Sequence, residues 1–410
     1  MNVRARFPAG PPTGAVPLVE AVTTAPPDGP LVVGDERMLD FLVAFGRRLL
    51  APPVARRFPE LGSLGFFLRR GELRRNLAGL ADPPEVLRFP RGLLFHVPPA
   101  NVDTIFVYSW ALSAVAGNPN IVRISTRSAG AADLVLELLN ETVVDAHPAV
   151  GATQRMVSYD RDDATTAALS LACDLRVLWG GDSSVTQLRR FPLQPWARDL
   201  TFPDRSSFTV LAAQGWSDAD PDARRRVAEG LYNDVYWFDQ AACSSPRALF
   251  WVGDEASVAA ARVELTDALA AVVEHRRPVI DAAMAVQKRV ATYGLAADGA
   301  AERLRFRGNE IAEVDLAAAA DVPREWLGSG TLVQARVDRL EDLVPLVVRR
   351  DQTICHFGFA EETLTAFARA LAGRGVDRLV PVGQALAFAP VWDGYDLVRE
   401  FTRLTTVALR

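Results

Sequence analysis

The chain of 410 residues is poor in lysine, and its positive charge does not exceed its negative charge. Lys288 is the only lysine, so arginine supplies nearly all of the positive charge, and we attribute this bias to genomic base composition. The formal net charge at pH 7 is −5. A nucleic-acid-binding protein is expected to carry a basic patch or stripe. The acidic balance therefore argues against that class.

Cysteine and histidine are also scarce, with three and four residues spread along the chain. Cys173, Cys243 and Cys355 lie far apart without paired spacing, which argues against a disulfide framework and against a zinc site. The histidines show no metal-ligand spacing, so we expect no metal. This cysteine usage fits a reducing compartment. No apolar run is long enough to span a bilayer and no signal peptide opens the chain, so we expect a cytoplasmic protein.

What the sequence does contain is a regular alternation of short apolar runs and helical segments. With 49% hydrophobic and 23% charged residues, the chain fits a globular protein of two or three domains. Between residues 92 and 190 the alternation predicts a doubly wound parallel sheet that binds a nucleotide beyond the carboxyl ends of its strands. Its predicted strands are Gly92–Val97, Asn120–Ile124, Arg155–Tyr159 and Leu175–Trp179.

The second half of the chain predicts a second α/β domain. We divide the chain into an N-terminal arm (1–35), an NADP(H)-binding domain (36–208), a catalytic domain (209–380) and a C-terminal part (381–410). This last part is predicted to contain a closing helix at Tyr395–Leu404. It is also predicted to contain a strand at Thr405–Leu409 that could add to a sheet edge, such as that of a partner subunit.

The candidate nucleophile is Cys243, within Asp-Gln-Ala-Ala-Cys-Ser-Ser-Pro at residues 239–246. A cysteine thiolate attacks carbonyl carbon well and forms a thioester with the acyl group. The small neighbours of Cys243 leave room for a substrate carbonyl, and Pro246 ends the local structure. The ordinary alternative is a buried structural thiol, because most cysteines without a disulfide behave as small hydrophobic residues.

The pattern Asp-Gln-x-x-Cys-Ser-Ser-Pro resembles the nucleophile segment of the LuxC-type fatty acyl-CoA and acyl-thioester reductases, a branch of the aldehyde dehydrogenase superfamily. The resemblance implies an aldehyde dehydrogenase-like fold with a second α/β domain that carries the cysteine. Val97-Pro98-Pro99-Ala100-Asn101 resembles the superfamily segment in which Pro-x-Asn follows a strand. By this resemblance Asn101 and the backbone N–H of Cys243 hold the oxyanion. The alternative role for Asn101 is a simple helix N-cap.

Two further segments resemble the cofactor site of the superfamily. The stretch 118–127 resembles its second nucleotide-domain strand, which ends at the adenosine ribose. Arginine near that position suits a phosphate and favours NADPH over NADH, although solvated strand-end charges are the alternative. The glycine turn after Trp179 matches the turn that approaches the cofactor diphosphate. The predicted cofactor-binding residues are Val97, Pro98, Pro99, Arg123, Ser125, Arg127, Gly180, Gly181, Asp182 and Ser183.

One departure from the superfamily bears on the reaction. Aldehyde dehydrogenases carry a Glu that activates water to release an acid, whereas the corresponding stretch Thr201–Phe208 has none. The resemblance therefore implies NADPH-dependent reduction of an acyl thioester, acyl-CoA or carrier-protein-bound, to an aldehyde. It also implies an acyl-transferring protein partner and a homo-oligomer. The alternatives are an NAD(P)-dependent aldehyde dehydrogenase and a non-catalytic scaffold that keeps the fold.

Overall fold

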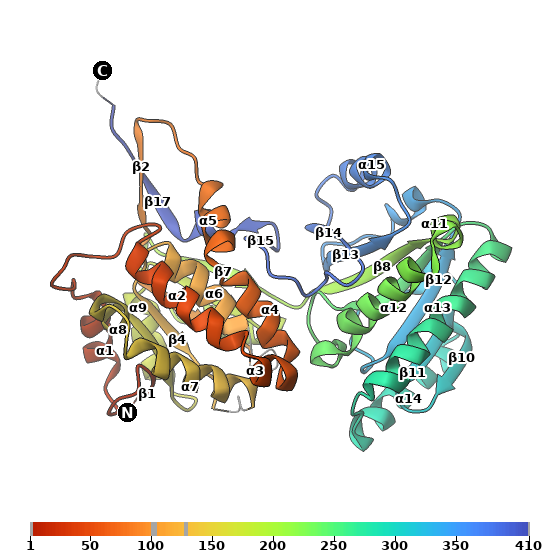
Figure 1. Ribbon diagram of the computed structural model, residues 1–410, viewed down its shortest axis with the longest axis horizontal. Coiled ribbons are helices and arrows are strands. Elements are labelled where there is room, and N and C mark those ends of the chain that lie inside the picture. Colours follow the sequence, from red (N-terminus) through yellow and green to blue (C-terminus); the bar gives the residue numbers. More distant parts are fainter. Residues whose placement is uncertain (1–2, 100–104, 127–129, 409–410) are drawn as a thin grey trace. The chain divides into compact units, whose positions relative to one another are not determined.

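The structure, a computed structural model, describes residues 3–99, 105–126 and 130–408. The chain forms two compact units, each a sheet covered by helices (Figure 1). The first unit comprises Met1–Pro203 and Phe388–Arg410, and the second comprises Asp204–Ala387. In the described part of the chain, no helix combines the length and the apolar character needed to cross a membrane.

The first unit is built on a six-stranded sheet in the order β1-β5-β4-β3-β6-β7. All neighbouring strands run parallel except the edge strand β1, which is antiparallel to β5. Successive residues of β3 enter different cores, because Leu94 packs in one apolar cluster and Phe95 in another. The strands are β1 (Arg4–Phe7), β3 (Leu94–Val97), β4 (Asn120–Arg123), β5 (Gln154–Ser158), β6 (Leu175–Trp179) and β7 (Arg198–Phe202).

Helices of the first unit supply the apolar side chains that cover this sheet. Helix α6 is buried along its whole length, as expected for a helix that follows a central strand of a doubly wound sheet. The helices are α1 (Ala15–Thr23), α2 (Glu36–Leu49), α3 (Pro52–Arg57), α4 (Pro59–Phe67), α5 (Arg70–Ala78), α6 (Ile105–Val115), α7 (Ala131–Val143), α8 (Pro148–Thr153), α9 (Asp163–Ala172) and α10 (Asp182–Arg189).

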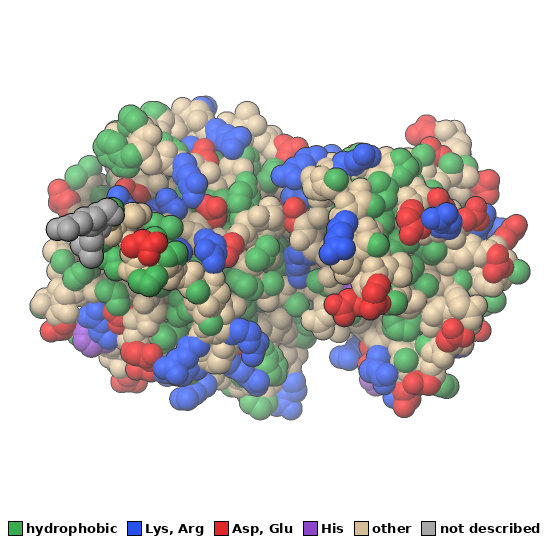
Figure 2. Space-filling model, turned by 90° about the horizontal axis from the view of Figure 1, so that it is seen from above, with side chains coloured by type: hydrophobic (Ala, Val, Ile, Leu, Met, Phe, Trp, Pro, Cys, Tyr) green, Lys and Arg blue, Asp and Glu red, His purple; other side chains and the backbone are tan. Residues whose placement is uncertain are grey.

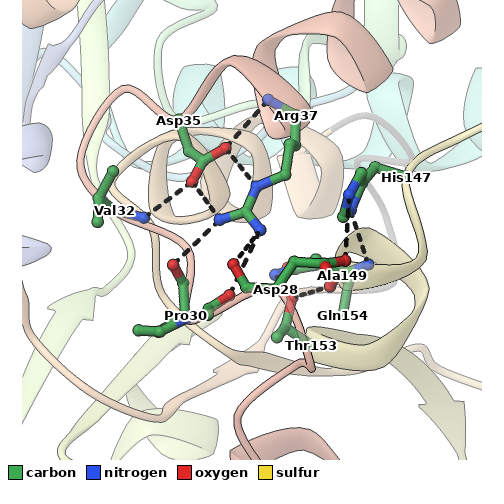
Figure 3. A network of polar contacts seen from close by, with 10 residues as sticks. Asp28, Pro30, Val32, Asp35, Arg37, His147, Ala149, Thr153 and Gln154 are labelled. Carbon is green, nitrogen blue, oxygen red and sulfur yellow. Dashed lines mark hydrogen bonds and ion pairs between the residues drawn. The ribbon is translucent and has the colours of Figure 1, made fainter.

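Residues 3–35 contain strand β1 and helix α1 and lead into α2. Asp35 caps α2 by accepting a hydrogen bond from the backbone N–H of Arg37 at 3.0 Å. The Arg37 guanidinium donates hydrogen bonds to the Asp35 carboxylate at 2.7 Å and to the carbonyl of Pro30 at 3.1 Å (Figure 3). The Arg37 side chain lowers the pKa of Asp35 below its ordinary value. These bonds fix the segment that leads into α2.

The predicted closing helix at Tyr395–Leu404 is wrong in all but one turn, whereas part of the predicted strand at Thr405–Leu409 is present. This part of the chain forms strands β15 (Val391–Trp392) and β16 (Tyr395–Asp396), the single turn α16 (Leu397–Glu400) and strand β17 (Thr402–Thr406). Strand β17 pairs antiparallel with β2 (Val86–Pro90) of the same chain. Three of its five residues are β-branched threonines, which favour a strand over a helix. A homo-oligomer stays a prediction.

The second unit contains a seven-stranded sheet in the order β10-β11-β12-β9-β8-β13-β14. Only the edge strand β10 is antiparallel to its neighbour. This predominantly parallel α/β architecture is the predicted fold class, although the antiparallel edge strands were not predicted. The strands are β8 (Ser206–Ala212), β9 (Pro246–Val252), β10 (Ala301–Arg307), β11 (Ile311–Leu316), β12 (Thr331–Val337), β13 (Asp351–Phe357) and β14 (Arg378–Pro381).

Two apolar cores cover the two faces of this sheet, because Leu249 and Phe250 of β9 enter different clusters. The helices are α11 (Ala213–Asp218), α12 (Pro221–Tyr236), α13 (Glu255–Arg276), α14 (Ala282–Ala297) and α15 (Glu361–Leu371), with short 3-10 turns η1 (Trp237–Gln240), η2 (Ala319–Asp321) and η3 (Leu340–Leu343). Acidic and basic side chains are interspersed on the face of the molecule seen in Figure 2.

Candidate functional site

The strand order of the first sheet creates a switch point between β3 and β6, since β4 lies on one side of β3 and β6 on the other. Ligands of open α/β sheets bind beyond the carboxyl ends of strands at such a point. Strands β3, β4 and β6 end there at Val97, Arg123 and Trp179. The predicted cofactor-binding residues that the structure describes lie at or just after these strand ends. The fold therefore brings them together at the carboxyl end of the sheet. Their binding role stays a prediction.

The turn between β6 and α10 is built from two glycines that precede a helix N-terminus. Gly180 adopts a φ of +156°, and Gly181 forms the N-cap of α10 without any side-chain cap. The first turn of a helix has N–H groups without intrahelical partners, and these groups with the helix dipole favour an anion. Asp182 and Ser183 begin the helix. The N–H groups of this turn favour an anion, whereas the Asp182 carboxylate in the same first turn opposes one, and diphosphate binding here stays a prediction.

Arg123 adds a positive charge at the same sheet edge. Its guanidinium carbon lies 4.7 Å from the centre of the Tyr159 ring, a cation–π contact. Burial raises the pKa of Tyr159 above its ordinary value, so the phenol stays neutral. Asn101 and Arg127, the predicted oxyanion donor and second cofactor arginine, lie outside the described residues.

A buried polar network joins residues of β3, β4, β6 and α6, and sequence reasoning missed it. The Asn120 amide nitrogen donates to the carbonyl of Asn118 at 2.9 Å, so its oxygen accepts from Nε2 of His96 at 2.9 Å. Nδ1 of His96 then accepts from the Ser109 hydroxyl at 2.9 Å, and Trp179 donates to that hydroxyl at 3.2 Å. Burial lowers the pKa of His96 to about 4. The polar residues inside otherwise apolar strand sequences were the available signal.

The candidate nucleophile lies in a tightly turned loop of the second unit. Helix α12 leads into η1, where Phe238, Asp239 and Gln240 have φ values of 54°, 54° and 60°. Residues with a Cβ pay about 1–2 kcal/mol each for this left-handed conformation. Cys243 follows three residues later, half-buried, just before β9. A loop with three such residues needs specific contacts to hold it in this unfavourable backbone conformation.

Gln240 provides one set of those contacts. Its side chain is 2% exposed. The amide nitrogen donates to the carbonyls of Pro246 at 2.7 Å and Thr331 at 3.0 Å, and the amide oxygen accepts from the N–H of Thr331 at 3.1 Å. These bonds attach the loop to the beginning of β9 and of β12.

Ser207 of β8 provides another contact, on the carboxyl side of the nucleophile. Its hydroxyl donates to the carbonyl of Cys243 at 2.7 Å and accepts from the N–H of Thr353 at 3.1 Å. Ser207 is 1% exposed. The loop is therefore attached to β8 and β13 as well.

Cys243 differs from the other two cysteines in its surroundings. Cys173 and Cys355 are fully buried, as predicted for core residues, and burial raises the pKa of Cys173 to about 12 and also raises that of Cys355. Arg247 lies close enough to Cys243 for their charges to interact: burial lowers the pKa of Arg247, and the Cys243 thiolate opposes that shift. A neighbouring cation favours the reactive thiolate form.

The stretch that lacks the superfamily Glu contains structural ion pairs instead. Arg205 is 6% exposed, donates to the Asp377 carboxylate at 2.8 Å, and also donates to the carbonyl of Asp351 at 2.8 Å. Asp204 is exposed, with its carboxylate 3.9 Å from the Arg350 guanidinium. Within residues 201–208, all of them described, Asp204 is the one carboxylate.

The fold is that of the aldehyde dehydrogenases. The NAD-dependent aldehyde dehydrogenase from Sinorhizobium meliloti superimposes with a TM-score of 0.70 at 16% identity, covering 99% of this chain and 90% of that one. The aldehyde dehydrogenase KauB from Pseudomonas aeruginosa gives 0.69 at 14% identity, covering 99% and 92%. At this identity the likeness establishes the fold alone.

Within that fold the family is also established. The sequence model of the acyl-CoA reductase (LuxC) family matches residues 85–406, and the chain belongs to this family. The chain is similar to proteins named long-chain acyl-protein thioester reductase. The one from Photorhabdus laumondii is 24% identical over 334 residues, and that from Photorhabdus luminescens is 24% identical over 333. Each alignment covers 79% of this chain but 65% of the relative, so the chain spans less than two thirds of these relatives' length.

Proposed function

We propose that this protein reduces an acyl thioester to an aldehyde through a covalent acyl group on Cys243, with NADPH as the reductant. The proposed substrate is an acyl-CoA or an acyl group carried on a protein. The protein-borne form agrees with the name of these relatives, long-chain acyl-protein thioester reductase. An acyl-transferring protein is the corresponding proposed partner.

The observation that carries this proposal is the setting of Cys243. It lies within the span of the family match, in a loop held by buried hydrogen bonds and beside a cation. Cys243 is half-buried, whereas the other two thiols are fully buried. A nucleophilic cysteine needs partial access and a nearby cation that favours the thiolate. Cys243, the half-buried thiol of the three, also interacts with Arg247.

In the proposed reaction the Cys243 thiolate attacks the thioester carbonyl carbon and forms a new carbon–sulfur bond. The bond from that carbon to the donor sulfur breaks, and the departing thiolate takes up the proton that Cys243 lost on ionisation. The backbone N–H of Cys243 is the proposed oxyanion donor, together with Asn101, whose role stays a prediction. When the Cys243 sulfur later leaves the reduced carbon, the aldehyde is released and the thiolate is restored.

The proposed cofactor site is the edge of the first sheet, where the β6–α10 turn would hold a diphosphate and Arg123 a ribose phosphate. A bound NADPH would supply the hydride that reduces the acyl carbon. Residues 201–208 contain no Glu, the residue type that the resemblance to aldehyde dehydrogenases implies as the base that activates water. This absence supports reduction rather than hydrolysis.

The test is consumption of NADPH, followed by absorbance, with medium- and long-chain acyl-CoA and with acyl groups on a carrier protein. We expect aldehyde to form in proportion to NADPH consumed, and Cys243→Ala to abolish it. Cys355→Ala is the matched control, since it removes a buried thiol of the same unit. Aldehyde formation by Cys243→Ala at the wild-type rate would refute the proposal.

A further inference from the structure

The nucleophile loop, residues 240–246, is held closed by a side chain that makes the hydrogen bonds a neighbouring strand would make. The Gln240 amide exchanges two hydrogen bonds with the backbone N–H and carbonyl of Thr331, the pattern that a paired β residue makes with its own backbone. The same amide nitrogen reaches the carbonyl of Pro246 at 2.7 Å. One side chain therefore ties the first residue of the loop to its last residue and to β12.

Ser207 fixes the middle of the same loop. It accepts from Thr353 and donates to the carbonyl of Cys243, so the hydroxyl has one donor and one acceptor and holds a defined orientation. The Cys243 carbonyl is thereby locked against β8 and β13. This bond restrains the peptide that follows the nucleophile, and Gln240 restrains the chain before it.

The backbone gives a reason why such restraints are needed. The three consecutive left-handed residues at 238–240 include a bulky Phe and are disfavoured without external contacts. Trp326 also donates its indole N–H to the carbonyl of Asp239 at 2.7 Å. The contacts thus gather around the segment whose local conformation is least favourable, directly before Cys243.

We propose that Gln240 and Ser207 are positioning residues that hold the Cys243 thiol in its reactive orientation. This inference rests on the proposed function of Cys243. Neither side chain is proposed to touch the substrate. Gln240 closes the loop and Ser207 fixes the nucleophile's carbonyl, so loss of either lets the thiol leave its productive position while the sheets stay folded.

The proposal predicts opposite changes in two rates without the labelling of buried Cys173 and Cys355 that general destabilisation would produce. A loosened loop exposes the half-buried thiol, so alkylation of Cys243 by iodoacetamide becomes about fivefold faster, the factor expected from losing one net hydrogen bond. A misplaced thiol attacks thioester less well, so kcat falls about tenfold while KM stays within about twofold. Ser207→Ala and Gln240→Met are the two variants.

Thr209→Val is the matched control. Thr209 lies two residues after Ser207 in β8, is fully buried, and its hydroxyl interacts with the Cys355 thiol. Peptide mass spectrometry after timed alkylation separates Cys243 from Cys173 and Cys355, whose labelling reports unfolding. We expect Thr209→Val to label Cys243 at the wild-type rate.

The inference is overturned if Cys243 is alkylated within twofold of the wild-type rate in folded Ser207→Ala, or if Thr209→Val accelerates it equally. Should Gln240→Met unfold, as shown by labelling of the buried cysteines, Ser207→Ala decides the question. A wild-type protein that alkylates normally but reduces no thioester would refute the proposed function, while the alkylation rates would still decide whether these residues position Cys243.

Discussion

Acid should destabilise the first unit through His96. This imidazole is fully buried, donates from Nε2 to Asn120 and accepts at Nδ1 from Ser109. Protonation would place a second donor at Nδ1, where the Ser109 hydroxyl already donates and burial penalises the charge. The folded-state pKa is therefore lowered from 6.5 to about 4. Because the folded form resists protonation, the stability is present above pH 6.5 and is lost as pH falls toward 4.

The linkage relation gives the size of this effect. For these two pKa values, the free energy of unfolding falls by about 2 kcal/mol between pH 7 and pH 5 through His96 alone. We would measure urea unfolding at several pH values by circular dichroism, for wild type and for the non-titrating His96→Gln. We expect His96→Gln to be less stable at pH 7 and the difference to shrink by about 2 kcal/mol at pH 5. A difference that is constant with pH would refute the reasoning.

Three other predictions concern Asp234, Arg123 and Arg205. Burial raises the pKa of Asp234 to about 7 despite hydrogen bonds from two backbone N–H groups. The stability that Asp234 contributes is therefore present below about pH 4 and is lost as pH rises through 7. In urea unfolding, the free-energy advantage of wild type over Asp234→Asn should shrink by about 2–3 kcal/mol from pH 5 to pH 8. An advantage that grows over this range would contradict the prediction. Arg123→Met should lower kcat/KM for NADPH about tenfold and for NADH less than twofold in steady-state kinetics. Equal losses with the two cofactors would show that Arg123 does not recognise the ribose phosphate. Arg205→Met should lower the free energy of unfolding by about 3 kcal/mol, because it leaves the carboxylate of Asp377 without its ion-pair partner. The control Asp204→Asn, at an exposed residue, should change the free energy of unfolding by less than about 0.5 kcal/mol. Similar losses in both variants would argue against a stabilising role for this ion pair.

The parallel sheets were predictable because buried parallel strands read as short apolar runs separated by helical segments. The runs that contain Val97 and Trp179 became β3 and β6, side by side at the switch point. The partners of segments that pair over long distances were not predicted. Strand β17 exists because β2, more than 300 residues away, offers an edge, and β1 likewise needs β5. Local sequence does not encode such pairings.

For the site, a motif located the nucleophile but not the contacts that hold it. Cys243 and the glycine turn were found from residues adjacent in sequence. Ser207 lies 36 residues before Cys243 and meets its carbonyl only because β8 runs beside β9. Gln240 was visible in the motif, yet its role depends on Thr331, 91 residues away. Roles created by tertiary contact could not be derived from spacing along the chain.

The central claim is a covalent acyl group on Cys243 that NADPH removes. The most direct measurement is the intact mass of wild type and Cys243→Ala after mixing with a medium-chain acyl-CoA or an acylated carrier protein, before and after NADPH is added. The account predicts a single acyl adduct on wild type alone, which disappears with NADPH as aldehyde forms. An adduct that persists on Cys243→Ala, or no adduct on wild type with either donor, would contradict it.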